Sequence, residues 1–301
     1  VGSTSMGNIL TKKFYRQRKD FEDSCAGRDA GLTFPEGVIC STDIAYADDG
    51  IKAHMLDIYR PEDSQEKILP VIINVHGGGL IIGNKEFNRY FCALLCKKGF
   101  LVYSIEYRLI PDCLIYDQIA DVFMAMDYIK ERLAADGGDS SHVYMAGDSG
   151  GACLITYANA IQNSTNIARA ANVTPSGLRI NALGLISGMF YTSRFDKIGL
   201  FLPKYLYGRD YKKTPFAKYV NPENRELLNS LAPVWLVTSH NDFLRRYTTD
   251  FEKALTRAER EHELVVFPKN KKLTHAFSVF EPFMPESGAV IDMMVEYLRK
   301  F

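Results

Sequence analysis

Short apolar runs alternate with amphipathic stretches from about residue 38 to the end of the chain. Runs of this length, bounded by turn residues, predict strands. There are eight of them: Val38–Tyr46, Ile51–Tyr59, Val71–Val75, Leu101–Ile105, Val143–Gly147, Ala182–Ser187, Val234–Ser239 and Leu264–Phe267. The first two are joined through Asp48-Asp49-Gly50, which favours a hairpin. Most of the later runs are apolar on both faces, as strands of a buried parallel sheet are.

Helical periodicity fills the intervals between these strands. Apolar residues spaced by three and four positions predict helices at Phe87–Lys98, Asp117–Ala135, Gly150–Asn163, Thr249–Arg260 and Glu286–Lys300. Strands that alternate with helices after an antiparallel start predict an α/β fold with helices on both faces of the sheet.

Three segments do not follow this alternation of strands and helices. Residues 1–7 lack an apolar core and are interpreted as an expression scar or flexible start. Residues 8–33 are polar and basic with scattered apolar positions, and one or two short helices outside the core are expected there. Residues 190–220 contain nine aromatic residues, far above the 12% average of the chain. A long crossover packed on the sheet is one interpretation; a cap that supplies apolar walls to a site is the favoured one.

Composition narrows the class of protein. The 301 residues are 47% apolar, with 36 basic and 36 acidic side chains, so the net charge is zero. Nucleic-acid binding requires an overall excess of cations, and no run approaches the roughly 18 apolar residues of a membrane span. We therefore expect one soluble domain over residues 8–301, with no nucleic-acid partner and no integral membrane contact.

The six cysteines form no compact disulfide framework and no leader precedes them. Cys92 and Cys96 have the spacing of half a zinc site, but a second Cys/His pair is missing. Buried free thiols, a cytoplasmic location and no metal are expected. The oligomeric state stays open, with a homodimer as one option.

The strongest chemical signal is Gly147-Asp148-Ser149-Gly150-Gly151, which follows a predicted strand and opens a predicted helix. In this context the G-x-S-x-G pattern forms a tight turn that exposes a nucleophilic serine at the carboxyl edge of the sheet. The alternative is a purely structural role, in which the serine of a glycine-rich turn only caps the helix.

A second glycine motif, His76-Gly77-Gly78-Gly79, follows the strand Val71–Val75. Its spacing does not match a phosphate-binding loop. Backbone N–H groups of Gly77 and Gly78, together with that of Gly150, are predicted to form an oxyanion hole. His76 is expected to support this loop through hydrogen bonds rather than act as a base.

A nucleophilic serine needs a base and an orienting carboxylate, which follow it in the order Asp, then His. His275 follows the strand Leu264–Phe267 and is preferred over His262, which lies in a charged run. Asp242 follows the strand Val234–Ser239, whereas its rival Asp250 lies within the next helix. The predicted triad is therefore Ser149, Asp242 and His275.

Together these residues resemble the hormone-sensitive-lipase-like esterases of the α/β-hydrolase fold. The resemblance covers roughly residues 38–301 and includes Leu56-Asp57-Ile58-Tyr59-Arg60-Pro61, Tyr107-Arg108-Leu109-Ile110-Pro111, Asn241-Asp242-Phe243-Leu244 and Thr274-His275-Ala276-Phe277. It implies a mostly parallel eight-stranded sheet, a catalytic triad, and a helical cap built here from about residues 8–33 and 190–220. Gly150 stands where the family commonly has Ala, and Arg245-Arg246 stand where a second acidic residue often follows.

The resulting hypothesis is a serine hydrolase that cleaves short- to medium-chain carboxylic esters through an acyl-enzyme, without a cofactor. An amidase, arylformamidase or peptidase would use the same triad. A lipase proper would need a large apolar lid. A hydrolase fold used only to bind small molecules is disfavoured, because all three triad candidates are present.

Overall fold

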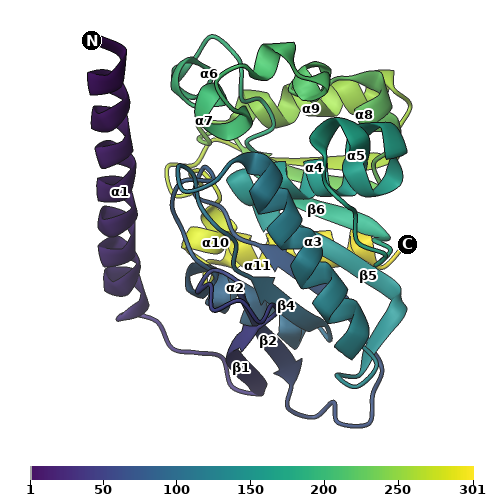
Figure 1. Ribbon diagram of the computed structural model, residues 1–301. Helices are drawn as coiled ribbons and strands as arrows, with labels where there is room; N and C mark the ends of the chain where they lie inside the picture. Colours follow the sequence, from purple (N-terminus) through teal and green to yellow (C-terminus); the bar gives the residue numbers. More distant parts are fainter. Residues whose placement is uncertain (1) are drawn as a thin grey trace.

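The computed structural model of the chain describes the backbone of residues 2–301 and the side chains from Met6 onward (Figure 1). All eight predicted strands are present in one sheet, whose order is β1-β2-β4-β3-β5-β6-β7-β8. Their bounds are β1 Val38–Ala45, β2 Met55–Pro61, β3 Leu69–Val75, β4 Leu101–Ile105, β5 Gly138–Asp148, β6 Ala182–Ile186, β7 Val234–Ser239 and β8 His262–Phe267.

The sheet is mostly parallel, as expected. Strand β2 pairs antiparallel with β1, which confirms the hairpin, and also antiparallel with β4. Every other neighbouring pair is parallel. The carboxyl ends of β3, β5, β7 and β8 therefore open at the same edge of the sheet, and loops from these four strands can meet there.

Two layers of helices cover the two faces of this sheet. Alternate residues of each buried strand point to opposite sides, so Ile72 and Ile73 belong to different cores. Helices α2 (Arg89–Lys97) and α11 (Pro285–Leu298) pack on one side, and α3 (Ile115–Arg132), α4 (Gly150–Asn163) and α9 (Arg245–Arg257) on the other. Shorter helices complete the layers: η1 (Lys85–Asn88), α5 (Thr165–Ala171), α8 (Arg225–Asn229) and α10 (Phe277–Phe280).

The amino-terminal segment differs from the short helices expected for residues 8–33. It forms one helix, α1, over Gly2–Asp29, so residues 2–7 are its first turns; Val1 lies outside the described residues. Figure 1 shows α1 standing along one side of the molecule. Two arginines tie it there. Arg18 donates to the carbonyl oxygens of Ile81 and Ile110, at 2.8 and 2.7 Å. Arg28 donates to two further carbonyls on the body of the protein.

The aromatic-rich segment after β6 folds into short helices: α6 (Lys197–Phe201), α7 (Pro203–Tyr207), η2 (Tyr211–Lys213) and η3 (Pro215–Tyr219). Helices α6 and α7 lie at the end of the molecule where α1 begins (Figure 1). Phe14 of α1 packs edge-on against Tyr205 of α7, with ring centroids 5.1 Å apart. Five of the nine aromatic residues of this segment are buried, against one another and against rings of neighbouring helices. Phe216, for example, contacts the rings of Tyr116, Tyr157, Tyr207 and Tyr219.

The six cysteines are all free, and Cys25, Cys92, Cys96 and Cys153 are buried, in agreement with the expectation of free thiols. Among residues 2–301, no helix combines the length and the apolar character that crossing a membrane requires.

The buried ring of Phe216 should be a main source of stability in this segment. We expect Phe216→Ala to lower the free energy of unfolding by about 3–5 kcal/mol, because it leaves a cavity among four tyrosine rings. Phe195→Ala, a matched change at a side chain that is 95% exposed, should have almost no effect. Denaturant unfolding followed by circular dichroism measures both, and equal losses would contradict the interpretation.

Candidate active site

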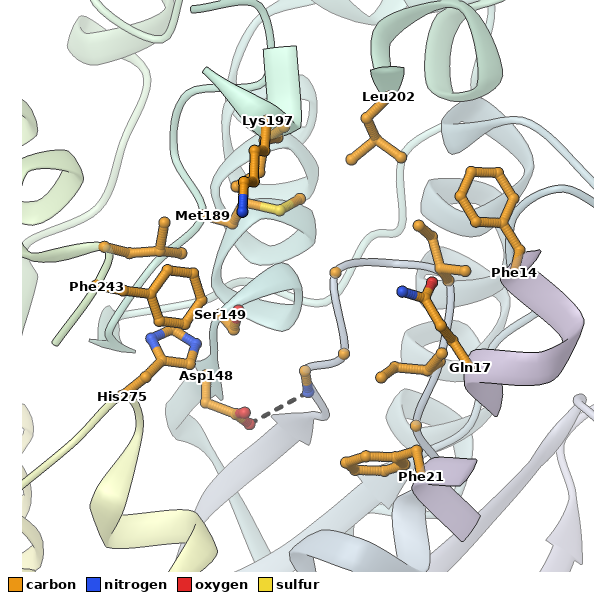
Figure 2. A pocket seen from close by; sticks show the side chains of 18 of the residues that line it. Phe14, Gln17, Phe21, Asp148, Ser149, Met189, Lys197, Leu202, Phe243 and His275 are labelled. Carbon is orange, nitrogen blue, oxygen red and sulfur yellow. Dashed lines mark hydrogen bonds between the residues drawn. The ribbon is translucent and has the colours of Figure 1, made fainter. Parts of the chain in front are cut away.

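The sequence-predicted site residues meet at the carboxyl edge of the sheet, around one cavity. Ser149 lies between β5 and α4, Asp242 follows β7, and His275 follows β8. The glycine loop follows β3. Figure 2 shows Ser149, Asp148 and His275 together on one side of the cavity, with residues of α1 on the other.

Ser149 occupies a strained turn. Its backbone has φ +47° and ψ −115°, a conformation that residues other than glycine rarely adopt. Crowding explains the glycines on either side. A Cβ on Gly147 would lie 2.5 Å from the carbonyl oxygen of Val75, and one on Gly151 would lie 2.0 Å from it. The turn is fixed further by the bond from Ser149 N–H to the Ile186 carbonyl, at 2.9 Å. The serine side chain is thereby presented in front of the amino terminus of α4.

His275 and Asp242 form a hydrogen-bonded pair, with 2.7 Å between Nδ1 and Oδ1. The carboxylate of Asp242 also accepts from Thr238 Oγ1 at 2.8 Å and from the Leu244 N–H at 2.9 Å. Because a carboxylate only accepts, Nδ1 of His275 donates in this bond, and in the neutral imidazole Nε2 is then the proton acceptor. In Figure 2 the imidazole of His275 lies on the same wall as Ser149, beside the ring of Phe243.

The surroundings of Asp242 favour its ionised form. Burial acts to raise the pKa of this carboxyl, but hydrogen bonds from His275, Ser187 and the Leu244 N–H outweigh it, together with the charge of His275. The pKa of Asp242 is consequently lower than the ordinary 3.8. An ionised carboxylate on Nδ1 both orients the imidazole and stabilises its protonated form.

The glycine loop requires one correction to the predicted oxyanion hole. The N–H of Gly77 donates to Asp148 Oδ1 at 3.2 Å, so it is already engaged. A Cβ on Gly77 would lie 2.3 Å from the Asp148 carboxylate, which shows how closely the two are packed. Within residues 2–301, the N–H groups of Gly78 and Gly79 donate to no acceptor. Gly150 opens α4, where the N–H groups of the first turn have no partner inside the helix.

His76 supports the loop, as expected. It is buried and stacked on Tyr107, with ring centroids 4.3 Å apart. Its Nδ1 faces the Gly77 carbonyl at 2.8 Å and its Nε2 faces Glu106 Oε1 at 2.7 Å. Burial acts to lower the pKa of His76, but Glu106 and the carbonyl outweigh it and raise the pKa. Glu106 carried no sequence motif that would have identified it.

The rival residues have other partners. His262 binds Glu252, at 2.9 Å, and the Arg260 carbonyl. Asp250 forms an ion pair with Arg194, at 2.8 Å.

The cavity has a volume of about 680 Å³ and mostly apolar walls. One wall is α1, through Leu10, Phe14, Gln17 and Phe21; another includes Met189, Lys197, Ile198, Phe201 and Leu202. Segment 190–220 supplies apolar walls to the cavity through Ile198, Phe201 and Leu202. Of its nine aromatic residues only Phe201 lines the cavity, and most of the others are buried in the interior instead. The α1 residues were missed, although their spacing of four, three and four would have indicated one helix face.

The lowered pKa of Asp242 predicts a pH-dependent contribution to stability. Because the pKa is lower in the folded than in the unfolded chain, the stabilisation is present above the unfolded value and is lost as the pH falls through the folded value. The free energy of unfolding should therefore fall more steeply below about pH 4 in the wild type than in Asp242→Asn. Urea unfolding across the acid range measures this. Asp210→Asn, at an exposed site, should follow the wild type, and parallel profiles for wild type and Asp242→Asn would contradict the prediction.

Comparison with curated proteins finds esterases. A probable isoprenylcysteine alpha-carbonyl methylesterase of Oryza sativa subsp. japonica is 29% identical over 184 residues, which are 58% of this chain and 44% of that protein. Esterase LipQ of Mycobacterium tuberculosis is 32% identical over 120 residues, 39% of this chain and 28% of that protein. The chain thus spans less than half the length of these relatives.

Solved structures show the same fold at greater coverage. Esterase B from Lactobacillus rhamnosis superimposes with a TM-score of 0.91 at 22% identity, over 98% of this chain and 96% of that one. EstE1, a carboxylesterase from a metagenomic library, gives 0.72 at 18% identity, over 95% and 97%. A family model for the alpha/beta hydrolase fold matches residues 72–278. This match confirms the resemblance drawn from the two glycine motifs: the chain belongs to the α/β-hydrolase fold family.

Proposed function

We propose that this protein is a serine hydrolase that cleaves carboxylic esters through an acyl-enzyme. The observation that carries the proposal is the Asp242–His275 pair on the same cavity wall as Ser149, which is held in a strained strand-to-helix turn. Three features of this set support the proposal: the lowered pKa of Asp242, the hydrogen bond that occupies Nδ1 of His275, and the position of Ser149 on the cavity wall.

In this mechanism His275 Nε2 accepts the proton of Ser149 as Oγ attacks the ester carbonyl carbon. Asp242 holds the imidazole in place and stabilises its positive charge. The protonated imidazole then gives the proton to the leaving alcohol as the C–O bond breaks. A water molecule attacks the acyl-enzyme in the same way and releases the acid.

The negative charge on the carbonyl oxygen needs donors that are not engaged elsewhere. Gly150 and Gly78 keep the role that the sequence suggested for them. For the third donor we propose Gly79 in place of Gly77, because the N–H of Gly77 is engaged by Asp148 while that of Gly79 is not. A Cβ on Gly150 would lie 3.1 Å from the Gly79 nitrogen, so the backbones of these two glycines lie close together with no side chain between them.

The cavity supports an uncharged acyl group as the part of the substrate that is bound. Its walls are mainly aliphatic and aromatic, which suits short- to medium-chain acyl esters. The relatives are named methylesterase and esterase, and esterase B has been solved with a tributyrin phosphonate inhibitor. Tributyrin and p-nitrophenyl esters are accordingly suitable first substrates.

Removal of the nucleophile tests the proposal directly. We expect Ser149→Ala to lower kcat/KM for p-nitrophenyl acetate by about 10⁴-fold or more, since the acyl-enzyme cannot form. Ser164→Ala, at a serine that caps α5, serves as the matched control and should retain activity. Unchanged turnover by Ser149→Ala would refute the assignment. Wild-type activity on a matched anilide that exceeds activity on the ester would identify an amidase instead.

The wall formed by α6 should set the acyl length that is accepted. Ile198 lines the cavity, whereas Leu200 on the same helix is exposed and does not. Ile198→Trp should lower kcat/KM for the octanoate ester at least tenfold more than for the acetate ester, because the larger ring takes the space of the chain. Leu200→Trp should leave this ratio unchanged. Equal effects of the two substitutions on p-nitrophenyl ester turnover would contradict the assignment of this wall.

A further inference from the structure

Charge is divided unevenly between two segments of the chain, residues 2–19 and 194–218, and the rest of the molecule. Residues 2–19 and 194–218 together contain twelve basic and two acidic residues, a net charge of +10. The rest of the chain has 24 basic and 34 acidic residues, a net charge of −10. Figure 1 shows the amino-terminal half of α1 at the same end of the molecule as α6 and α7, so the positive charge is concentrated at one pole. The zero net charge of the chain conceals this polarity.

One side of α1 combines this charge with exposed apolar side chains. Met6, Ile9, Lys13 and Arg16 are spaced by three, four and three residues, which places them in one stripe along the helix. Met6 and Ile9 are 66% and 63% exposed. The stripe borders the row that lines the cavity and lies on the opposite side of the helix from Arg18, which binds the body of the protein. It therefore forms one bank of the cavity mouth.

The opposite bank of the cavity mouth also combines exposed apolar side chains with positive charge. Phe201 and Phe243 line the cavity, yet their side chains are 55% and 75% exposed, and Phe195 is 95% exposed just before α6. Lys197 reaches into the cavity beside Met189 in Figure 2. Neither Lys197 nor Lys13 on the facing bank forms an ion pair with any residue of the described chain. Exposed aromatic rings gathered at a cavity mouth mark an interaction surface, because soluble proteins seldom expose large apolar patches. The unpaired ammonium groups beside them give this surface a positive charge.

We propose that this rim, made of the α1 stripe, the three phenylalanines and Lys197, docks on an anionic lipid surface and turns the cavity mouth toward it. Basic side chains are attracted to anionic headgroups, and aromatic and aliphatic side chains enter the boundary of the acyl chains. Nucleic acid would engage the positive charge but not Met6 and Ile9. A dissolved anion would engage only the two cavity lysines. The docking goes beyond ester hydrolysis and is measured without it.

The test uses the full chain carrying Ser149→Ala, so that no lipid is consumed. Its binding to vesicles of phosphatidylcholine with about 30% phosphatidylglycerol is measured by flotation, with pure phosphatidylcholine vesicles in parallel. We expect binding only to the anionic vesicles, weakened by salt. Lys13→Gln, Arg16→Gln and Lys197→Gln combined should weaken it at least tenfold, because each basic residue near such a surface contributes about fivefold.

A matched variant removes the same charge from the opposite end of the molecule. Lys67→Gln, Lys130→Gln and Lys300→Gln change exposed lysines near the amino edge of the sheet and should leave vesicle binding unchanged. Phe195→Ser with Phe201→Ser should remove the binding that persists at high salt. All variants are surface changes whose folding is checked by thermal unfolding.

Four results would overturn the proposal: no binding to anionic vesicles, equal binding to neutral ones, equal weakening by the two triple variants, or tighter binding to duplex DNA than to vesicles. Loss of vesicle binding together with retained hydrolysis of p-nitrophenyl acetate by the wild type would reject the docking surface alone. Vesicle binding by the Ser149→Ala chain, with no hydrolysis of p-nitrophenyl acetate by the wild type, would reject the proposed function alone.

Discussion

The left-handed backbone of Ser149 is the constraint on which the rest of the site depends. A non-glycine residue at this φ costs of order 1–3 kcal/mol, so neighbouring contacts must maintain it. Here the end of β3 does so, because the carbonyl oxygen of Val75 leaves no room for a side chain at Gly147 or Gly151. The same packing brings the glycine loop after β3 beside the amino terminus of α4. The proposed nucleophile and the proposed oxyanion donors are thus positioned by one close contact between two adjacent strands.

Local signals explain why the sheet and the positions of the three triad candidates could be predicted. Each buried strand is a short apolar run, and the residues that follow a parallel strand must emerge at one edge. Ser149, Asp242 and His275 could be placed there from strand ends and chain order alone. The engagement of Gly77 could not, since Asp148 lies 71 positions further along the chain. The hydrogen bonds that Thr238 and Ser187 give to Asp242 likewise have no signature in the sequence.

The cap was harder to predict, because aromatic side chains are typical both of protein interiors and of apolar binding sites. The composition of residues 190–220 therefore did not show which of its rings would be buried and which would line a cavity. Phe216 and Phe201 lie in neighbouring short helices of the same segment, yet Phe216 is enclosed by tyrosine rings and Phe201 lines the cavity. The single long α1 was also unexpected. A polar helix of this kind is stabilised less by its own periodicity than by contacts with distant parts of the fold.

Those contacts have a consequence for sequence variation. Arg18 and Arg28 hold α1 largely through main-chain carbonyl oxygens, at Ile81, Ile110, Phe87 and Val279. Every amino acid supplies a carbonyl oxygen, and that oxygen does not titrate. The side chains at the receiving positions are therefore free to diverge, and the pH to change, while the anchor persists. Related chains can remodel the α1 wall of the cavity, one residue at a time, without detaching the helix that carries it.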